Sequence, residues 1–136
     1  MAEPVLRVRG LAVAFTASGQ SVPAVQGIDF EVFANEVLGI VGESGSGKTT
    51  LLRVLSGMMA PDAGTVLWRG QDVLAMGEAA RRRLMRTEWG YVHQNPRDGL
   101  RLAVSAGGNV GERLMAVGAR HYGKIRDTAS DWLGRV

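Results

Sequence analysis

One glycine-rich stretch constrains this chain more than any other feature. Residues 42–49 read Gly-Glu-Ser-Gly-Ser-Gly-Lys-Thr and fit the pattern G-x-x-x-x-G-K-[ST] of a phosphate-binding loop. Apolar, β-type residues precede it at 37–41, and a helical apolar pattern follows it from Leu51 to Leu55. Strand, glycine loop and helix, in this order, are the setting that such a loop requires. The sequence therefore predicts a site that binds the phosphates of a nucleotide.

The residue types in the loop explain how it would hold phosphates. Glycines permit the backbone angles of a nest of inward-pointing N–H groups, and the following helix adds the positive end of its dipole. Lys48 supplies charge for the β- and γ-phosphates, the Thr49 hydroxyl would ligate Mg²⁺, and Thr50 offers a hydroxyl to the α-phosphate. A glycine turn without a ligand would not need Lys followed by Thr at this offset. The predicted nucleotide contacts are Gly42, Glu43, Ser44, Gly45, Ser46, Gly47, Lys48, Thr49 and Thr50.

Composition limits the class of protein. At 136 residues the chain is one domain or a piece of a larger one, and 46% hydrophobic and 21% charged residues are globular values. It has no cysteine, which excludes disulfides and cysteine metal sites and agrees with a cytoplasmic location. The amino terminus lacks the regions of a signal peptide, and no apolar run approaches about 18 residues. We therefore expect any membrane association to be peripheral.

Charge is distributed unevenly along the chain. Residues 1–80 carry 5 basic and 8 acidic side chains, whereas residues 81–136 carry 11 and 5. A basic second half suits nucleic acid, an acidic protein surface or phosphates as partners. No aromatic interleaving or groove-reading motif accompanies the arginines, so we expect no nucleic-acid partner. The cluster of Arg81, Arg82, Arg83 and Arg86 is most simply a solvated helical face.

Alternation of apolar residues and turn residues predicts the elements. Strands are expected near 5–15, 28–32 and 65–68, with a turn at 34–36 in which Asn35 accepts left-handed backbone angles. Two further strands, at 37–41 and 89–93, are expected to lie in parallel and to be joined by a right-handed crossover. Helices are expected from Lys48 to about Gly57 and over 78–87, 109–117 and 125–133.

Two positions outside the loop carry a resemblance to a known family. Phe15 lies 27 residues before the loop at the end of a strand, and Gln94 lies 46 residues after Lys48, followed by Asn95 and Pro96. This order resembles the ATP-binding subunits of the ABC ATPase superfamily. The resemblance implies ATP and Mg²⁺ as ligands, stacking of Phe15 on adenine, catalytic roles for Lys48 and Gln94, and Thr49 and Gln94 as metal ligands. A core position for Phe15 and a turn-capping role for Gln94 are the alternatives.

The resemblance also implies a fold class, an α/β P-loop NTPase. Residues 1–136 would be the N-terminal part of one ABC ATPase domain: an antiparallel β-subdomain and incomplete parallel core sheet over 1–94, then the Q-loop and the start of the helical subdomain over 95–136. The superfamily's LSGGQ-type signature, Walker B Asp-Glu and switch His are absent from this sequence. Residues 104–109 imitate a signature, but we interpret them as a loop and helix start. We therefore expect a longer subunit, and no useful ATP hydrolysis by this chain alone.

A narrower resemblance lies in RRRLMRTEWGYVHQ at 81–94 and in the segment 95–123. Both are similar to ATP-binding proteins of bacterial phosphonate carbon–phosphorus lyase systems, although His93 stands where most relatives carry Phe. The implied partners are a second ABC ATPase subunit in a head-to-tail dimer and the soluble lyase complex. An importer of the peptide or nickel type, with a membrane permease as partner, is the alternative. The expected docking surface is rich in arginine and comprises Arg97, Arg101, Arg113 and Arg120.

Other classes of protein share the phosphate-binding loop. A GTPase is one, since Asp131 to Gly134 fits D-x-x-G, but this segment lies far from the loop and no base-reading motif occurs. A small-molecule kinase would leave the segment around Gln94 unexplained. A module that binds or docks a nucleotide without hydrolysing it also fits the 136 residues.

Overall fold

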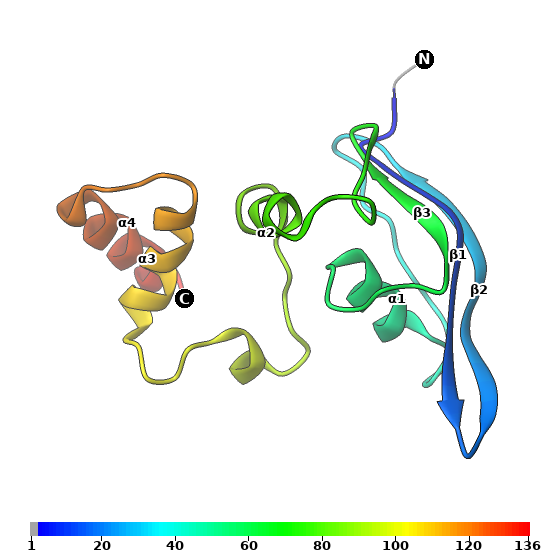
Figure 1. The fold of residues 1–136 in the computed structure, drawn as a ribbon. Coiled ribbons are helices and arrows are strands. Elements are labelled where there is room, and N and C mark those ends of the chain that lie inside the picture. The colour runs from blue at the N-terminus through cyan, green and yellow to red at the C-terminus, as the bar shows by residue number, and fades with distance from the viewer. Residues whose placement is uncertain (1–2) are drawn as a thin grey trace. The chain divides into compact units, whose positions relative to one another are not determined.

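The alternating apolar residues near the amino terminus form a long antiparallel hairpin. The computed structural model describes residues 3–136, in which β1 (Leu6–Ala17) pairs with β2 (Gln20–Val32). The turn between them uses two left-handed residues, Ser18 at φ 52° and Gly19 at φ 78°. The register places Leu6 opposite Val32 and Phe15 opposite Val22. The hairpin (Figure 1) is thus longer than the sequence predicts. Its register puts Phe15 near the closed end.

A four-stranded sheet and one helix enclose the core of the first unit. β3 (Ala63–Trp68) pairs with β1, and β4 (Gln71–Asp72) pairs with β3, giving the antiparallel order β2-β1-β3-β4. The helix α1 (Lys48–Leu55) buries Leu51 and Val54. Each such burial contributes roughly 1.5–3 kcal/mol. The predicted antiparallel β-subdomain is confirmed; its buried side chains are Val8, Leu11, Val13, Val25, Leu51, Val54, Val66 and Val73.

The second unit is helical. It contains most of α2 (Glu78–Thr87), the short 3₁₀ turn η1 (Pro96–Gly99), α3 (Ala106–Ala116) and α4 (Tyr122–Gly134). α3 and α4 pack closely because Gly111 is buried: a Cβ atom there would lie 2.9 Å from Cγ2 of Ile125. The Ser105 hydroxyl accepts the Gly108 N–H at 3.1 Å and so caps α3. Residues 104–109 are therefore a loop and a helix start, as predicted.

The two segments predicted to form parallel strands do not form them. The sheet in residues 3–136 contains only β1 to β4, and neither 37–41 nor 89–93 is a strand. Val37, Val41 and Val92 expose 95%, 93% and 95% of their surface. A parallel strand needs hydrogen-bonded neighbours and covering helices, and the described residues supply no strand neighbour to either segment. The predicted parallel pair and its right-handed crossover are thus wrong for this structure.

The chain divides into its two compact units between Arg81 and Arg82, whereas the sequence placed a boundary at 94/95. Leu84 is buried, and the Arg113 guanidinium donates to the carbonyls of Met85 (3.2 Å) and Trp89. Met85 lies in the last turn of α2, where main-chain acceptors lack helical partners, and Trp89 lies just beyond the helix. These contacts within the second unit tie the end of α2 to α3, so residues 82–94 belong with the helices that follow.

We expect Gly111→Ala to destabilise the chain by about 1–3 kcal/mol, because the new methyl group would force Ile125 and α4 away from α3. Gly107→Ala is the matched control, since Gly107 is also in α3 but a Cβ there meets no atom within 4 Å. A helical alanine with free space should be neutral or stabilising by up to about 1 kcal/mol. Urea unfolding followed by circular dichroism measures both, and equal stabilities of the two variants would contradict this packing.

Candidate nucleotide-binding site

Three glycines shape the loop before α1, through positive φ angles and through close approach of neighbouring atoms. Gly45 and Gly47 have left-handed φ angles of 81° and 92°, which other residues rarely adopt. A Cβ atom at Gly42 would lie 2.6 Å from the Ser46 hydroxyl oxygen, and one at Gly47 would lie 2.1 Å from the Ala24 carbonyl oxygen. The loop therefore folds tightly on itself, and its end lies directly against β2.

Lys48 closes this loop with its ammonium group. Nζ donates to the carbonyl oxygen of Gly42 at 2.8 Å, to that of Glu43 at 2.5 Å, and to the Ser46 hydroxyl at 3.1 Å. The side chain therefore reaches back over the loop to its first residue. An anion bound by the main-chain N–H groups of this loop would meet that positive charge directly.

The start of α1 offers further groups for an anion and its metal. Gly47 is the N-cap and provides no side-chain hydrogen bond, and no acidic residue occupies the first turn. Exposed N–H groups at such an end attract phosphate. Thr49 is exposed, and its hydroxyl makes no hydrogen bond within the described part of the chain. Hydroxyl and amide oxygens are hard donors that suit Mg²⁺, so Thr49 and Gln94 fit the metal by chemistry.

Phe15 is an exposed side chain near the closed end of the hairpin. It exposes 44% of its surface, and Val22, its partner across the hairpin, exposes 48%. Phe15 is therefore not part of the core that the described residues form. Gly47 touches Ala24, and the neighbouring Pro23 pairs with Ala14, so the hairpin end that carries Phe15 lies next to the start of α1. An exposed aromatic ring near a phosphate-binding loop provides a stacking surface for a base.

Gln94 lies in the second unit, on an exposed loop. The cap of η1 is Asn95, whose Oδ1 accepts the Arg97 N–H at 3.1 Å, so the alternative role of Gln94 as a turn cap falls away. His93 packs its ring against Gly99, where a Cβ would lie 2.9 Å from Cδ2, and meets the Tyr91 ring edge-to-face at 4.7 Å. Gln94 and Lys48 belong to different units, and their approach to one ligand stays a prediction.

Three of the four arginines predicted to form a docking surface are bound within their own unit. Arg113 donates to main-chain carbonyls at and just beyond the end of α2. Arg120 donates to the carbonyl of Met115 in the last turn of α3 at 2.8 Å and to that of Ala119 in the following loop at 2.9 Å. Arg101 lies 3.3 Å from the Glu112 carboxylate. Cations suit the C-terminal ends of helices because unpaired carbonyls and the helix dipole are negative there. Arg97 alone among the four has no side-chain partner in the described residues.

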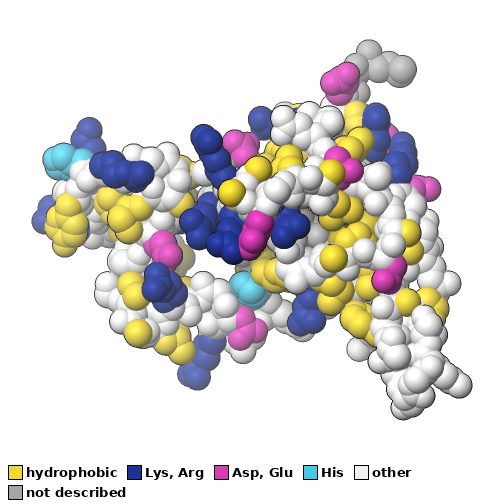
Figure 2. Space-filling model, viewed as in Figure 1, with side chains coloured by type: hydrophobic (Ala, Val, Ile, Leu, Met, Phe, Trp, Pro, Cys, Tyr) yellow, Lys and Arg dark blue, Asp and Glu magenta, His cyan; other side chains and the backbone are white. Residues whose placement is uncertain are grey.

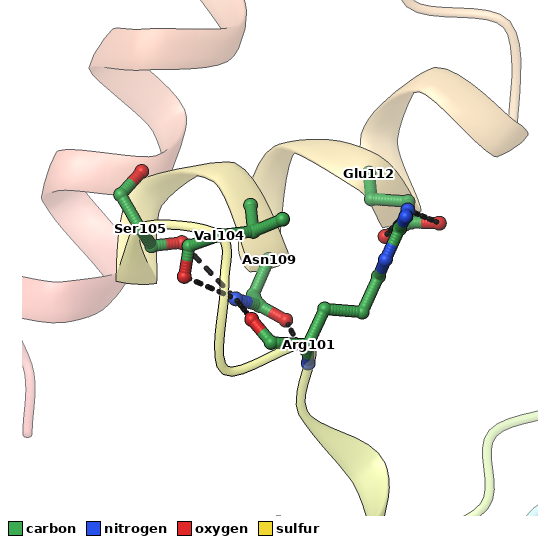
Figure 3. Close-up of polar contacts among 5 residues, drawn as sticks. All are labelled: Arg101, Val104, Ser105, Asn109 and Glu112. Carbon is green, nitrogen blue, oxygen red and sulfur yellow. Dashed lines mark hydrogen bonds and ion pairs between the residues drawn. The ribbon is translucent and has the colours of Figure 1, made fainter.

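Sequence reasoning missed Asn109, which holds the segment between η1 and α3. Its Oδ1 accepts the Arg101 N–H at 2.8 Å, and its Nδ2 lies 3.1 Å from the carbonyl oxygens of Arg101, Val104 and Ser105 (Figure 3). Beside this segment is a groove of about 910 Å³, with Arg86, Leu100, Leu102 and Leu133 among its lining residues. The only advance indication was the type of residue, since Asn readily bonds nearby main chain.

The described helices include none that is long and apolar enough to cross a lipid bilayer. The glycine loop at the start of α1, the hairpin beside it and the helical unit that follows are the parts of an ATP-binding cassette. A profile of the ABC transporter family matches residues 25–136, and the chain belongs to that family.

Two relatives by sequence indicate the kind of ATP-binding protein that this chain resembles. A protein of Escherichia coli (strain K12), described as putative phosphonates utilization ATP-binding protein PhnK, is 55% identical over all of this chain and 52% of its own length. The lipoprotein-releasing system ATP-binding protein LolD 2 of Caulobacter vibrioides is 38% identical over 94 residues, 69% of this chain and 41% of its own. The resemblance to ATP-binding proteins of phosphonate systems is thereby confirmed. The chain spans about half the length of these relatives.

Solved structures confirm the fold class. The dimeric MJ0796, a bacterial ABC transporter cassette, matches with a TM-score of 0.82 and 21% identity over 90% of this chain and 53% of its own. The same cassette in a post-hydrolysis state bound to ADP and Pi matches with a TM-score of 0.84 and 21% identity over 93% and 54%. At this identity the likeness concerns the fold.

We expect Asn109→Asp to destabilise the second unit by about 1–3 kcal/mol, because a carboxylate would face three carbonyl oxygens without a donor. Asn95→Asp is the matched control: the side chain of Asn95 acts as an acceptor and caps a helical turn, a role that Asp fills equally well. Urea unfolding and amide hydrogen exchange over 101–105 provide the measurements. A loss of stability in Asn95→Asp as large as in Asn109→Asp would refute this role.

Proposed function

We propose that this chain binds Mg-ATP and belongs to an ATP-hydrolysing subunit that serves phosphonate utilisation in the cytoplasm. The observation that carries the proposal is the loop of residues 42–47 with the Lys48 ammonium across it, at the uncapped start of α1. The phosphonate role is supported by the name of the Escherichia coli relative and its 55% identity. The chain spans about half of that relative, so the activity of the whole protein remains part of the proposal.

In this mechanism the loop N–H groups and the start of α1 hold the triphosphate, while Lys48 neutralises its β- and γ-oxygens. Bound Mg²⁺ would supply further charge neutralisation there, with Thr49 as one ligand. Phe15 would stack on the base, and Gln94 would orient the attacking water. Transfer of a phosphoryl group depends mainly on such positioning and charge stabilisation. Signature and Walker B residues are absent from these 136 residues, so we propose that the chain alone binds without useful turnover.

We expect Lys48→Ala to abolish Mg-ATP binding, because it removes the one cation that bridges both ends of the loop. Lys124→Ala is the matched control: it removes the only other lysine, which lies in α4 of the second unit. Isothermal titration calorimetry with Mg-ATP should show wild-type affinity for the control and no measurable heat for Lys48→Ala. Equal affinities of the two variants would eliminate this site.

A soluble, acidic protein is the partner that we propose for the second unit, and the resemblance names a phosphonate lyase complex. The supporting observations are the groove beside Leu100 and Leu102 and the basic side chains gathered over α2 (Figure 2). Arg86 and Arg97 have no side-chain partner within the described residues and are free to pair with carboxylates. A second ATPase subunit agrees with the dimer named for MJ0796. The relative named for lipoprotein release favours the alternative, a transport role with a membrane component.

We expect the subunit to co-purify with a soluble lyase complex at low salt and to lose it at high salt, because exposed ion pairs are screened. Combined Arg86→Ala and Arg97→Ala should reduce recovery at low salt, whereas Arg126→Ala should not, since Arg126 is paired with Asp127. Pull-down from cells grown on a phosphonate gives the measurement. Recovery with an integral membrane permease instead would assign the subunit to transport.

A further inference from the structure

The strand that carries Phe15 loses one of its two neighbours just before that residue. β1 lies between β2 and β3, and its last pair with β3 joins Ala12 to Ala63. Beyond this pair the neighbour is a single residue, Asp62. Its N–H donates to the Ala12 carbonyl at 2.9 Å, and its Oδ2 accepts the Ala14 N–H at 2.6 Å. The Asp62 carboxylate thus continues the ladder of hydrogen bonds to the residue before Phe15.

Asp62 also connects this point of β1 with the nucleotide-binding loop. It lies in the short connection after α1, which ends at Leu55, and follows Pro61, whose ring restricts the backbone. At the other end of α1, Gly47 lies against Ala24 of β2, next to the pair of Ala14 and Pro23. The start of α1 and the connection that follows α1 therefore both contact the same part of the hairpin. The two contacts fix the distance between the phosphate-binding loop and the closed end of the hairpin.

We propose that Asp62 is a positioning residue that holds Phe15 at the correct distance from the phosphate-binding loop. The proposal rests on the proposed function, in which Phe15 contacts the base. Without the carboxylate, residues 14–17 of β1 would be held by β2 alone, and the end of a two-stranded ribbon opens readily. A base would then have to order this segment on binding, which lowers affinity. Asp62 itself touches neither base nor phosphate in this proposal.

The chain contains a matched control for this hydrogen bond. Asp29 of β2 accepts the Gly10 N–H through Oδ1, also at 2.6 Å. Both bonds join an aspartate carboxylate to a main-chain N–H of β1, and both are exposed. Gly10 lies five residues before Phe15, whereas Ala14 is its immediate neighbour. Asp29→Ala therefore removes the same kind of bond from the same strand without releasing the segment that carries Phe15.

The experiment compares the affinities of two probes, Mg-ATP and Mg-tripolyphosphate, by calorimetry on the full chain. Asp62→Ala should weaken Mg-ATP about three- to tenfold and leave tripolyphosphate unchanged, because only the former has a base to stack. Asp62→Asn retains an acceptor oxygen and should bind ATP nearly as the wild type does. Asp29→Ala should leave both affinities unchanged. In a Phe15→Ala background, Asp62→Ala should cause no further loss, since the contact it positions is gone.

Several outcomes would overturn the proposal. An equal loss of affinity for both probes would mean that Asp62 supports the loop or the fold in general. Asp62→Ala could lower ATP affinity further in the Phe15→Ala background, or Asp29→Ala could lower it as much as Asp62→Ala does. Either result would show that Asp62 does not act by positioning Phe15. If Phe15→Ala itself leaves ATP affinity unchanged, the base contact of the proposed function is wrong. Amide hydrogen exchange without nucleotide tests the hydrogen bond between Asp62 and Ala14. The Ala14 amide should exchange faster in Asp62→Ala and remain slow in Asp29→Ala. An unchanged exchange rate in Asp62→Ala would refute the role of this bond.

Discussion

The close contact between the start of α1 and the second strand of the hairpin is the constraint on which the first unit depends. Gly47 permits it, because any side chain there would collide with the Ala24 carbonyl. With the main chains this near, Leu51 and Val54 enter the core beside Val25. The same packing therefore stabilises the sheet and fixes the end of the phosphate-binding loop against Ala24 and Val25 of β2. The contact between α1 and β2 thus supports both the fold of the first unit and its candidate site.

The second unit is organised by polar side chains that bind main-chain carbonyls. Arg113 and Arg120 satisfy helix ends, and Asn109 gathers three carbonyls of the preceding segment. Exposed charges contribute little by pairing alone, but carbonyls left without a donor are costly. Part of the basic excess in residues 81–136 is thus structural. Arg113 and Arg120 keep their charge but have their donors engaged by main-chain carbonyls, and Arg97 is the predicted docking residue that has no side-chain partner in the described residues.

Sequence patterns predicted those elements that interactions between nearby residues determine. The hairpin, α1 and all of α2 follow from alternation, helical spacing and turn residues such as Asn35, whose φ is 63°. The parallel strands at 37–41 and 89–93 failed as predictions because a strand exists through its neighbours, which the described residues do not provide. The structural roles of Asp62 and Arg113 were missed for a related reason. Their partners, Ala14 for Asp62 and the carbonyls of Met85 and Trp89 for Arg113, lie far away along the chain, and only the fold brings them together.

The residues proposed to bind the nucleotide and to act in its hydrolysis belong to different units of the chain. The loop, Lys48, Thr49 and Phe15 all belong to the first unit, and each is placed by that unit's own core and hydrogen bonds. Gln94 belongs to the second, on a loop shaped by Asn95 and by the His93 ring on Gly99. Under the proposed function, the contacts with base and phosphates come from the first unit, and the orientation of water comes from Gln94 of the second. On that proposal, substitutions around Gln94 should change turnover more than nucleotide affinity.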